Sequence, residues 1–324
     1  MCINATWCRF PYIAMTKKAL FSQNILVILG STASGKSTLA VELARKFKGE
    51  IISADSRQVY RDLNIGTAKI TPQEMKGVPH HLLNIASPKK TFDVAEYQKQ
   101  AYRAIEKIHA QGKLPIICGG TGHYIDVLLG SQTIPNIPPN PKLRKKLEQY
   151  STEELFARLK TLDPRRAATI DRHNPRRLIR ALEIVVTTGE PVPEKKDTRQ
   201  ITKEKTAMLK IGIRLSPGEL KKRIDARLEK DLKRGLIREV ETLHNDGLSW
   251  KRFDELGLEY RYVAKFLRGE LKTKKELAEK LRTELWRYAK RQITWFKRDK
   301  EIHWVNNQRE AILSVKLFLK KKER

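Results

Sequence analysis

The clearest hydrophobic pattern in the chain is a run of five apolar residues, Ile25–Leu29, followed by a glycine-containing turn and a regularly spaced apolar stripe. A short, continuous apolar run next to turn residues is typical of a buried parallel strand. Leu39, Leu43 and Phe47 then follow at positions i, i+4 and i+8, which predicts a helix over Thr38–Phe47 that packs on a sheet. The pattern therefore predicts a strand, a sharp turn and a helix in direct succession.

The same criterion predicts two more strands in this half of the chain, and each ends at polar residues. Ile51–Ile52 starts a short strand with Asp55 at its carboxyl end, and Lys113–Cys118 forms another that runs into the sequence Gly-Gly-Thr-Gly, which contains Thr121. Between them, Phe92–His109 has a helical pattern. Ligands of doubly wound sheets bind at the carboxyl ends of the strands, so we expect Asp55 and Thr121 to lie near the first turn.

A proline-rich segment, Pro135–Pro141, marks a boundary, because proline lacks the backbone donor that a helix needs. Most of the chain beyond this segment has a charged, helical pattern, and we find no internal repeat. Helices are predicted over Lys142–Leu162, from Asp163, from Asn174, over Leu220–Leu243 with a break at Gly235, over Gly257–Arg261, over Glu276–Trp295 and over Arg309–Leu319; strands are predicted over Leu209–Leu215 and Ile302–Val305.

Composition limits the class of protein. The chain has 324 residues, of which 40% are hydrophobic, so it can form one large α/β domain with an additional part. It contains no apolar run near 18 residues, so no transmembrane helix is predicted. Cys2, Cys8 and Cys118 are too few and too scattered for a disulfide framework or a zinc cluster, which favours a reducing, intracellular setting. Residues 1–24 are weakly patterned and are interpreted as a tail, with Met15 as an alternative start.

The charge is strongly positive and unevenly distributed. Lys and Arg number 66 against 37 Asp and Glu, a net charge of +29. Residues 1–140 carry 17 basic and 9 acidic side chains (+8), which leaves 49 and 28 (+21) for residues 141–324. Such a field favours a polyanionic partner, above all a nucleic acid. A generally lysine-rich composition that serves solubility is the alternative explanation.

The turn after the first strand carries a phosphate-binding motif. Gly30–Ser37 reads GSTASGKS, which matches G-x-x-x-x-G-K-[ST]. Glycines let the backbone approach a phosphate, and consecutive N–H groups at a helix start form an anion cradle. Lys36 can reach a terminal phosphate, and the hydroxyl of Ser37 can bind Mg²⁺. The alternative is an ordinary Gly/Ser turn before a helix.

Other polar residues allow two interpretations each. Asp55 can act as a general base or bind a water ligand of Mg²⁺, or it can simply cap the turn that follows it. The pair His80 and His81 precedes an apolar run, but no third ligand has metal-site spacing, so structural histidines are the favoured interpretation. Arg176, Arg177 and Arg180 can contact phosphates or form a solvated basic face.

Several blocks occur together in a fixed order. They are Gly30–Ser37 (GSTASGKS), Ala54–Tyr60 (ADSRQVY), Ile65–Lys69 (IGTAK), Gly119–Tyr124 (GGTGHY), Asn174–Ile184 (NPRRLIRALEI) and Lys290–Phe296 (KRQITWF). As a set they closely resemble the tRNA dimethylallyltransferase family, also called tRNA isopentenyltransferase, and the resemblance covers about residues 25–305. The resemblance implies transfer of a dimethylallyl group from dimethylallyl diphosphate to N6 of adenine 37 beside the tRNA anticodon.

The resemblance also implies a fold and a domain plan. The expected fold is α/β, with a P-loop kinase-like parallel sheet core and an inserted, mainly helical tRNA-binding domain. The expected division is a tail (1–24), a first part of the core (25–136), a helical insertion that contacts tRNA (137–206) and a second part of the core with C-terminal helices that contact tRNA (207–324). A cytoplasmic enzyme is expected, with Mg²⁺ as cofactor, and nothing in the sequence requires more than a monomer.

Residue roles follow from the blocks. Asp55 corresponds to the acid that accepts the N6 proton, and Thr32 and Lys36 join it as expected catalytic residues. The diphosphate is expected to bind Gly30, Ser31, Thr32, Ala33, Ser34, Gly35, Lys36 and Ser37, the last of which also binds Mg²⁺. The expected tRNA contacts, including the path of the target base, are Asp55, Ser56, Arg57, Gln58, Thr121, Arg176, Arg177, Arg180, Arg261, Lys290, Arg291, Gln292, Thr294, Trp295 and Lys297.

The sequence departs from the family pattern at three positions. Ser31 replaces a usual proline, which is a small change. In a block of the type Arg-x-x-Gly-Tyr-Arg, Leu256 takes the place of the first arginine and Glu259 that of the glycine. If that arginine binds RNA or diphosphate, Arg261 or another cation must replace it.

Two rival functions remain open on sequence grounds. A small-molecule or nucleotide kinase has the same core, but it needs neither the +21 carboxy-terminal half nor the KRQITWF block. The basic and aromatic residues of that block suit RNA, and core aromatics between cations with buried stems are the equal alternative. A non-catalytic RNA-binding ATPase does not need Asp55 and Thr121.

Overall fold

The computed structural model describes residues 23–132, 134–135, 137–193 and 207–320. The chain divides into two compact units, Met1–Gly130 with Arg199–Arg324, and Ser131–Thr198. Most of the predicted tail and residues 194–206 lie outside the described residues. Among the residues described, no helix is both long and apolar enough to cross a membrane.

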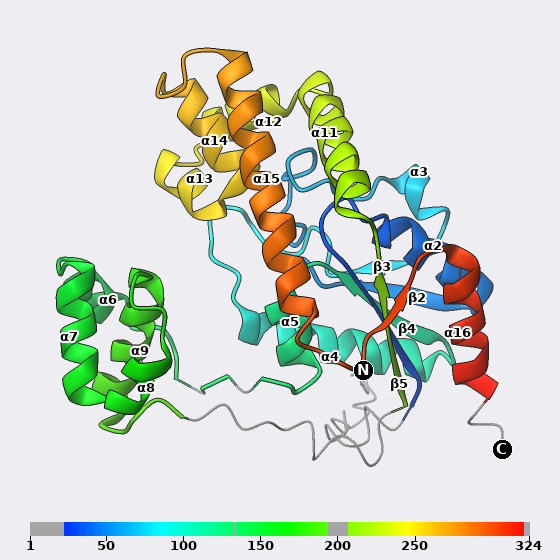
Figure 1. Ribbon diagram of the computed structural model, residues 1–324, viewed down its shortest axis with the longest axis horizontal. Coiled ribbons are helices and arrows are strands. Elements are labelled where there is room, and N and C mark those ends of the chain that lie inside the picture. Colours follow the sequence, from blue (N-terminus) through cyan, green and yellow to red (C-terminus); the bar gives the residue numbers. More distant parts are fainter. Residues whose placement is uncertain (1–22, 133, 136, 194–206, 321–324) are drawn as a thin grey trace, which may run out of the picture. The chain divides into compact units, whose positions relative to one another are not determined.

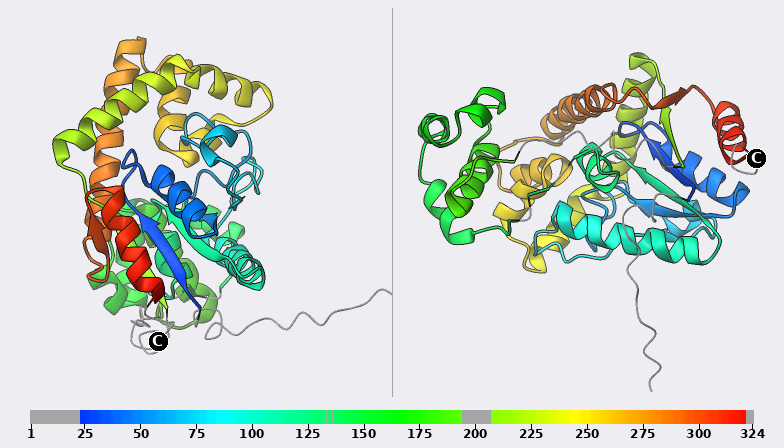
Figure 2. Two further views of the ribbon diagram at one scale, coloured as in Figure 1. Left: turned by 90° about the vertical axis from the view of Figure 1, so that its right-hand side faces the viewer. Right: turned by 90° about the horizontal axis from the view of Figure 1, so that it is seen from below.

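A parallel sheet forms the centre of the first unit (Figures 1 and 2). In the described residues its six strands lie in the order β3-β2-β4-β1-β5-β6. All neighbouring strands pair in parallel. The strands are β1 (Ile25–Leu29), β2 (Gly49–Ser53), β3 (His80–His81), β4 (Leu114–Gly119), β5 (Met208–Ile213) and β6 (His303–Val305). This is the α/β architecture that the sequence predicts.

The end of β4 lies between the ends of β1 and β2, because Leu29 and Ser53 pair with neighbouring positions of the same strand. Its last residue, Gly119, has no room for a side chain: an added Cβ would lie 2.1 Å from the carbonyl oxygen of Ala54. The first glycine of the GGTG sequence thus lets β4 pass directly beside the chain that leads to Asp55.

Helices cover both faces of the sheet, as the alternation along β1 requires. Ile25, Val27 and Leu29 pack in one cluster with residues of α4 (Val94–Ala110) and α5 (Gly122–Leu128). Leu26 and Ile28 pack on the other face with α2 (Lys36–Lys46) and α16 (Gln308–Lys320). A short helix, α3 (Pro72–Met75), follows in the connection before β3.

A third cluster joins helices from the last part of the chain, and it includes Phe253, Tyr260 and Leu281. The helices are α11 (Pro217–Lys233), α12 (Leu236–Asn245), α13 (Trp250–Leu256), α14 (Leu258–Leu267) and α15 (Lys274–Phe296). Gly235, with φ of +97°, separates α11 from α12, so the predicted break is confirmed. The sequence pattern did not reveal α13 as a separate helix.

The second unit is helical and has its own core around Leu155, Leu159 and Leu178. Its helices are α6 (Pro141–Leu147), α7 (Thr152–Leu162), α8 (Pro164–Thr169) and α9 (Pro175–Thr188). The single helix predicted over Lys142–Leu162 is wrong. Ser151 accepts from the backbone N–H of Glu154, whose side chain accepts from the N–H of Ser151, and this capping box starts a new helix.

Candidate active site

The phosphate-binding motif forms the predicted turn between β1 and α2. Gly35 adopts a left-handed conformation (φ +90°), and α2 begins at the next residue, Lys36. The Lys36 ammonium group donates to the carbonyl of Ser31 at 3.2 Å. Burial lowers the pKa of Lys36, and the nearby Asp55 carboxylate opposes that shift. The lysine is therefore a half-buried cation close to an acid, in a turn suited to an anion.

Gln292 of α15 joins this turn to the GGTG sequence. Its side-chain oxygen accepts from the N–H of Thr32 at 2.8 Å, and its amide nitrogen donates to the carbonyl of Gly120 at 2.8 Å. A Cβ on Gly120 would lie 2.5 Å from that nitrogen, so the second glycine is needed for this contact. Gln292 was predicted to contact tRNA, and the structure gives it an internal bridging position.

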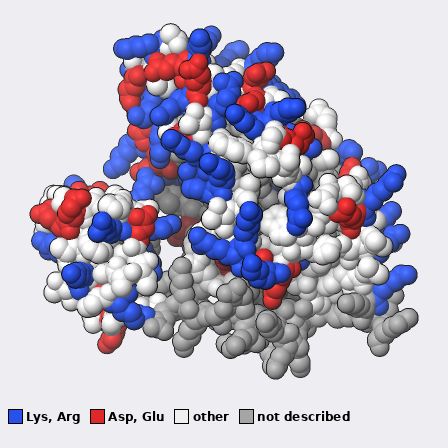
Figure 3. Space-filling model, in the orientation of Figure 1, with Lys and Arg blue, Asp and Glu red and all other residues white. Residues whose placement is uncertain are grey.

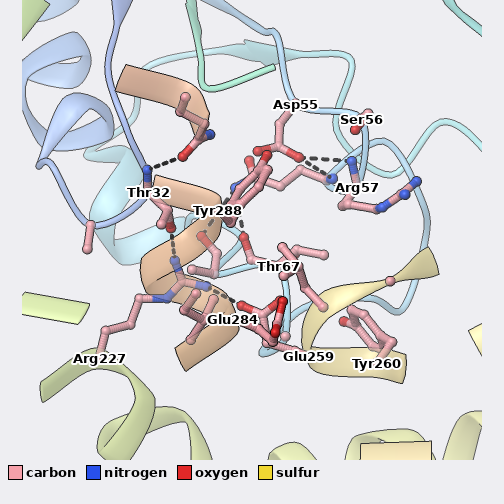
Figure 4. Close-up of a pocket in the computed structure, with 18 of the residues that line it drawn as sticks. Thr32, Asp55, Ser56, Arg57, Thr67, Arg227, Glu259, Tyr260, Glu284 and Tyr288 are labelled. Atoms are coloured by element: carbon pink, nitrogen blue, oxygen red, sulfur yellow. Dashed lines mark hydrogen bonds and ion pairs between the residues drawn. The ribbon is translucent and has the colours of Figure 1, made fainter. Parts of the chain in front are cut away.

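Asp55 lies in the turn after β2 and is held by the backbone. One carboxylate oxygen accepts from the N–H groups of Arg57 (2.8 Å) and Gln58 (3.3 Å), as Figure 4 shows. Its other oxygen makes no hydrogen bond to a side chain or backbone group that the structure describes. The hydroxyl of Thr121 accepts from the N–H of Ser56 at 3.1 Å, which fixes the same turn to the end of β4. Asp55 thus caps a turn, and half of its carboxylate stays available.

A pocket of about 470 Å³ connects these groups within the first unit. Its wall comprises the phosphate-binding turn, the turn at Asp55, the IGTAK loop, the start of α14 and one side of α15. The lining includes Thr32, Ala33, Gly35, Lys36, Ser37, Asp55, Ser56, Arg57, Gln58, Gly66, Thr67, Ala68, Arg227, Leu256, Glu259, Arg261, Glu284, Tyr288, Arg291 and Gln292. A cleft of this size accommodates a small ligand or a single base.

Arg227 of α11 points at the phosphate-binding turn, and the sequence reasoning missed it. Its guanidinium donates to the hydroxyl of Thr32, to Asp231 at 3.2 Å and to Glu259 at 3.1 Å. One turn earlier, Arg223 donates to the carbonyl of Ser34 at 3.4 Å. The only available signal was the spacing of two arginines by four residues, which equally describes a solvated helix face.

The two carboxylates that share Arg227 are buried. Asp231 is 4% exposed and Glu259 is 6% exposed. Burial raises the pKa of both groups, and Arg227 opposes that effect. The cluster is therefore one cation held between two acids, directly beside the phosphate-binding turn.

The block that departs from the family pattern lies at the same pocket. Leu256 is 2% exposed and belongs to the apolar cluster of α11–α15. Arg261, expected to replace the missing arginine, donates twice to the carbonyl of Asp254, at 2.9 and 2.6 Å. Arg227 and Arg223 of α11 thus contact the phosphate-binding turn, while Arg261 lines the pocket without such a contact.

The KRQITWF block places its residues on two sides of α15. Trp295 packs on Gly122, where a Cβ would lie 2.3 Å from the ring, and donates to Asp126 at 3.0 Å. The side chains on the other side are exposed, and Figure 3 shows basic side chains gathered over this part of the molecule. The exposed members are Lys290, Arg291, Thr294 and Lys297.

In the second unit, the three predicted arginines separate into two kinds. Arg176 and Arg177 are exposed. Arg180 instead pairs with the fully buried Glu183, which Arg144 also contacts at 2.8 Å. The paired arginines lower the pKa of Glu183 to about 2, although its burial acts in the opposite direction. The RNA contacts predicted for Arg176 and Arg177 stay predictions, and Arg180 has a structural ion pair.

The predicted histidine pair forms β3. His81 contacts Glu50 at 2.7 Å, and His80 contacts the carbonyl of Val78 at 2.8 Å. Both side chains therefore have protein partners at the edge of the sheet.

Comparisons with known proteins agree with one another. The family model for IPP transferase matches residues 58–299. The chain is 41% identical to a tRNA dimethylallyltransferase of Thermomicrobium roseum over 86% of this chain and 85% of that one. It is 42% identical to tRNA dimethylallyltransferase 2 of Trichlorobacter lovleyi, over 91% and 96%.

Solved structures show the same similarity. A tRNA isopentenylpyrophosphate transferase from Bacillus halodurans has a TM-score of 0.67 at 35% identity, with 92% of this chain and 96% of that one covered. A eukaryotic dimethylallyltransferase, described as acting on tRNA, has a TM-score of 0.71 at 28% identity, with 88% and 74% covered.

Proposed function

The chain belongs to the tRNA dimethylallyltransferase (IPP transferase) family, and from that premise we propose that it transfers the dimethylallyl group of dimethylallyl diphosphate to N6 of adenine 37 in tRNA. In this reaction the bond from N6 to the allylic carbon forms, the carbon–oxygen bond to diphosphate breaks, and the amine loses one proton. The products are N6-dimethylallyladenosine and diphosphate.

The diphosphate end of the donor is assigned to the phosphate-binding turn. Backbone N–H groups of this turn, Lys36 and Arg227 concentrate positive charge where the leaving group would gain negative charge. Fixed donors of this kind stabilise a developing anion without reorganising during the reaction. Ser37 lines the same pocket and fits Mg²⁺, which usually takes one or two protein ligands together with substrate phosphates and water. When bound, the metal would add charge neutralisation at the diphosphate.

Asp55 is assigned as the acceptor of the N6 proton. An exocyclic adenine amine is a poor nucleophile, so its placement and the removal of its proton carry much of the rate enhancement. The contacts from Arg57 and Gln58 hold one oxygen of Asp55 and fix the direction of the other. An acid fixed in this way in the same pocket as the phosphate-binding turn suits the acceptance of a proton from an incoming amine.

The RNA side of the proposal is supported by charge. Exposed Lys290, Arg291 and Lys297 on α15 and exposed Arg176 and Arg177 on α9 suit phosphate contacts. A base in a single-stranded anticodon loop can leave its stack for a few kcal/mol, which makes delivery to a pocket feasible. We extend the proposal to an enzyme that acts on tRNA as a monomer in the cytoplasm.

The observation that carries the proposal is the shared pocket of a phosphate-binding turn and the Asp55 carboxylate. The test is to incubate the protein with Mg²⁺, dimethylallyl diphosphate and an unmodified anticodon stem-loop with adenines at positions 36, 37 and 38. We expect N6-dimethylallyladenosine at position 37. Asp55→Asn preserves an acceptor for the two backbone N–H groups but cannot accept the proton, so activity should fall about 10²–10⁴-fold.

Asp62→Asn, which changes an exposed acid seven residues further on, is the matched control and should keep full activity. Undiminished product from Asp55→Asn would remove Asp55 from the role of base. Phosphorylated product with ATP, and none with dimethylallyl diphosphate, would identify a kinase instead.

A further inference from the structure

Tyr288 is a pocket residue that the proposed function leaves unused. It lies on α15 between Leu285 and Ala289, both of which are buried in the apolar cluster. Tyr288 itself is half-buried, and its ring lies on the pocket wall beside Asp55 (Figure 4). The tyrosine is therefore directed toward the ligand space and not into the core.

The other tyrosines of the pocket wall are engaged differently. Tyr260 is 2% exposed, donates to Glu239 at 2.7 Å and packs on Gly66. Tyr262 has the ammonium group of Lys280 5.9 Å from its ring centroid. Burial raises the pKa of the Tyr288 phenol, and the negative charge of the nearby Asp55 raises it further. Tyr288 therefore presents a neutral aromatic ring next to the assigned proton acceptor.

Arg291 supports the ring from the next turn of the same helix, with its guanidinium carbon 5.8 Å from the ring centroid. An adenine whose N6 faces Asp55 needs a surface for its flat face, because a hydrogen bond at the edge does not fix the ring plane. Stacking on an aromatic ring provides that surface and leaves the edge with N6 free.

We propose that Tyr288 is the stacking surface for the target adenine and thereby orients its N6 toward Asp55. This inference rests on the proposed function. The ring, and not the phenol hydroxyl, carries the effect. Loss of the ring should therefore impair use of the RNA and leave use of dimethylallyl diphosphate unchanged.

The direct test replaces the target adenine in the stem-loop by 2-aminopurine, which lacks the N6 amine and whose fluorescence falls when it stacks. With the enzyme and inorganic diphosphate in excess, we expect the complex of Tyr288→Leu to be severalfold brighter than the wild-type complex. Tyr288→Phe should match the wild type. Tyr102→Leu, which changes a half-buried tyrosine of α4 outside the pocket lining, is the matched control and should also match it.

Steady-state rates with the unmodified stem-loop give a second measurement. Base stacking of this kind corresponds to roughly a five- to hundredfold loss, so kcat/KM for RNA should fall by that amount in Tyr288→Leu. KM for dimethylallyl diphosphate should stay within twofold, and Tyr288→Phe should retain activity. A thermal melt of each variant checks that the fold is intact.

The outcomes distinguish a failure of the proposed function from a failure of the inference about Tyr288. If the wild-type protein forms no prenylated product, the proposed function fails. If it forms product but Tyr288→Leu shows wild-type fluorescence and wild-type kcat/KM for RNA, only the inference about Tyr288 is overturned. Equal losses in Tyr288→Phe and Tyr288→Leu would also overturn it, because the hydroxyl would then be the active group.

Discussion

Replacing Arg227 by methionine should weaken both the fold and the binding of the prenyl donor, and the structure allows these two effects to be separated. Methionine keeps much of the apolar stem but removes the guanidinium. Thr32 then loses its contact from α11, and Asp231 and Glu259 lose the cation that they share. Two buried acids remain with no cation in contact among the described residues.

The size of the stability loss follows from burial. The side chain of Arg227 is 20% exposed, and those of Asp231 and Glu259 are 6% and 8% exposed, so solvent screens the pairs only weakly. Breaking a buried ion pair by removal of one partner destabilises by roughly 3–5 kcal/mol. Because an unpaired buried carboxylate can take up a proton instead, we expect the lower end, about 3 kcal/mol. For a chain of this length that is a fall in Tm of about 6 °C.

The loss of activity has a different cause. If Arg227 faces the leaving diphosphate, removal of one fixed donor should reduce kcat by about 10²–10³-fold. The assay is product formation with a varied concentration of dimethylallyl diphosphate, alongside thermal unfolding. Arg223→Met is the matched control for stability. Its pair with Glu219 is exposed, and such pairs contribute about 0–1 kcal/mol, while its bond to the carbonyl of Ser34 is long at 3.4 Å.

A double variant distinguishes the two effects. Adding Glu259→Gln to Arg227→Met removes one unpaired charge, so most of the lost Tm should return while the activity stays low. Recovery of activity in the double variant would refute the role of Arg227 at the leaving group. An unchanged Tm in the single variant would refute the reasoning about the buried acids.

Three further predictions concern neighbouring groups. The pKa of Glu259 is raised from 4.5 in the folded state, so its contribution to stability is fully present below pH 4.5 and is lost as the pH rises through the raised value. Urea unfolding from pH 4 to 8 should show a larger loss in the wild type than in Glu259→Gln, in which Asp231 still has a raised pKa. Gln292→Leu leaves the partly buried N–H of Thr32 and the buried carbonyl of Gly120 without this partner. It should reduce the free energy of unfolding by about 1–3 kcal/mol and raise KM for the prenyl donor, whereas unchanged values of both would contradict the bridge. Gly119→Ala places a Cβ 2.1 Å from the carbonyl oxygen of Ala54 and should yield little folded protein, as expression can check. A Cβ at Gly218 meets no atom within 4 Å, so Gly218→Ala should have a Tm within about 2 °C of the wild type.

Local patterns were enough to predict much of the core. The apolar run before Gly30, the strand that leads to Asp55 and the glycine-rich turn at Thr121 each have their signal within a few residues. The rule that ligands bind at the carboxyl ends of parallel strands then brought these three turns together. The order of the strands had no such signal, and with it the position of β4 between β1 and β2 stayed unpredicted.

The residues that sequence reasoning missed depend on contacts between distant segments. Arg227 and Asp231 read as a charged pair on a helix surface, and only the packing of α11 against the phosphate-binding turn and α14 buries them. Tyr288 stands two residues before the recognised KRQITWF block, but nothing in its spacing distinguishes a pocket residue from a core aromatic. The missed helix break at Ser151 has a local cause, because its capping-box residues, Ser151 and Glu154, can be recognised in the sequence.

Leu256 and Glu259, the two positions that depart from the family pattern, lie in the same pocket as Arg227. Leu256 fills an apolar cluster, so no cation comes from that position. A glutamate at position 259 is buried at the pocket and needs a positive partner, which Arg227 provides from α11. The same guanidinium contacts Thr32, so the acid that replaces the family's glycine holds the cation at the phosphate-binding turn. In this chain Glu259 and Arg227 therefore form one arrangement beside Leu256, in which α11 supplies positive charge at the phosphate-binding turn.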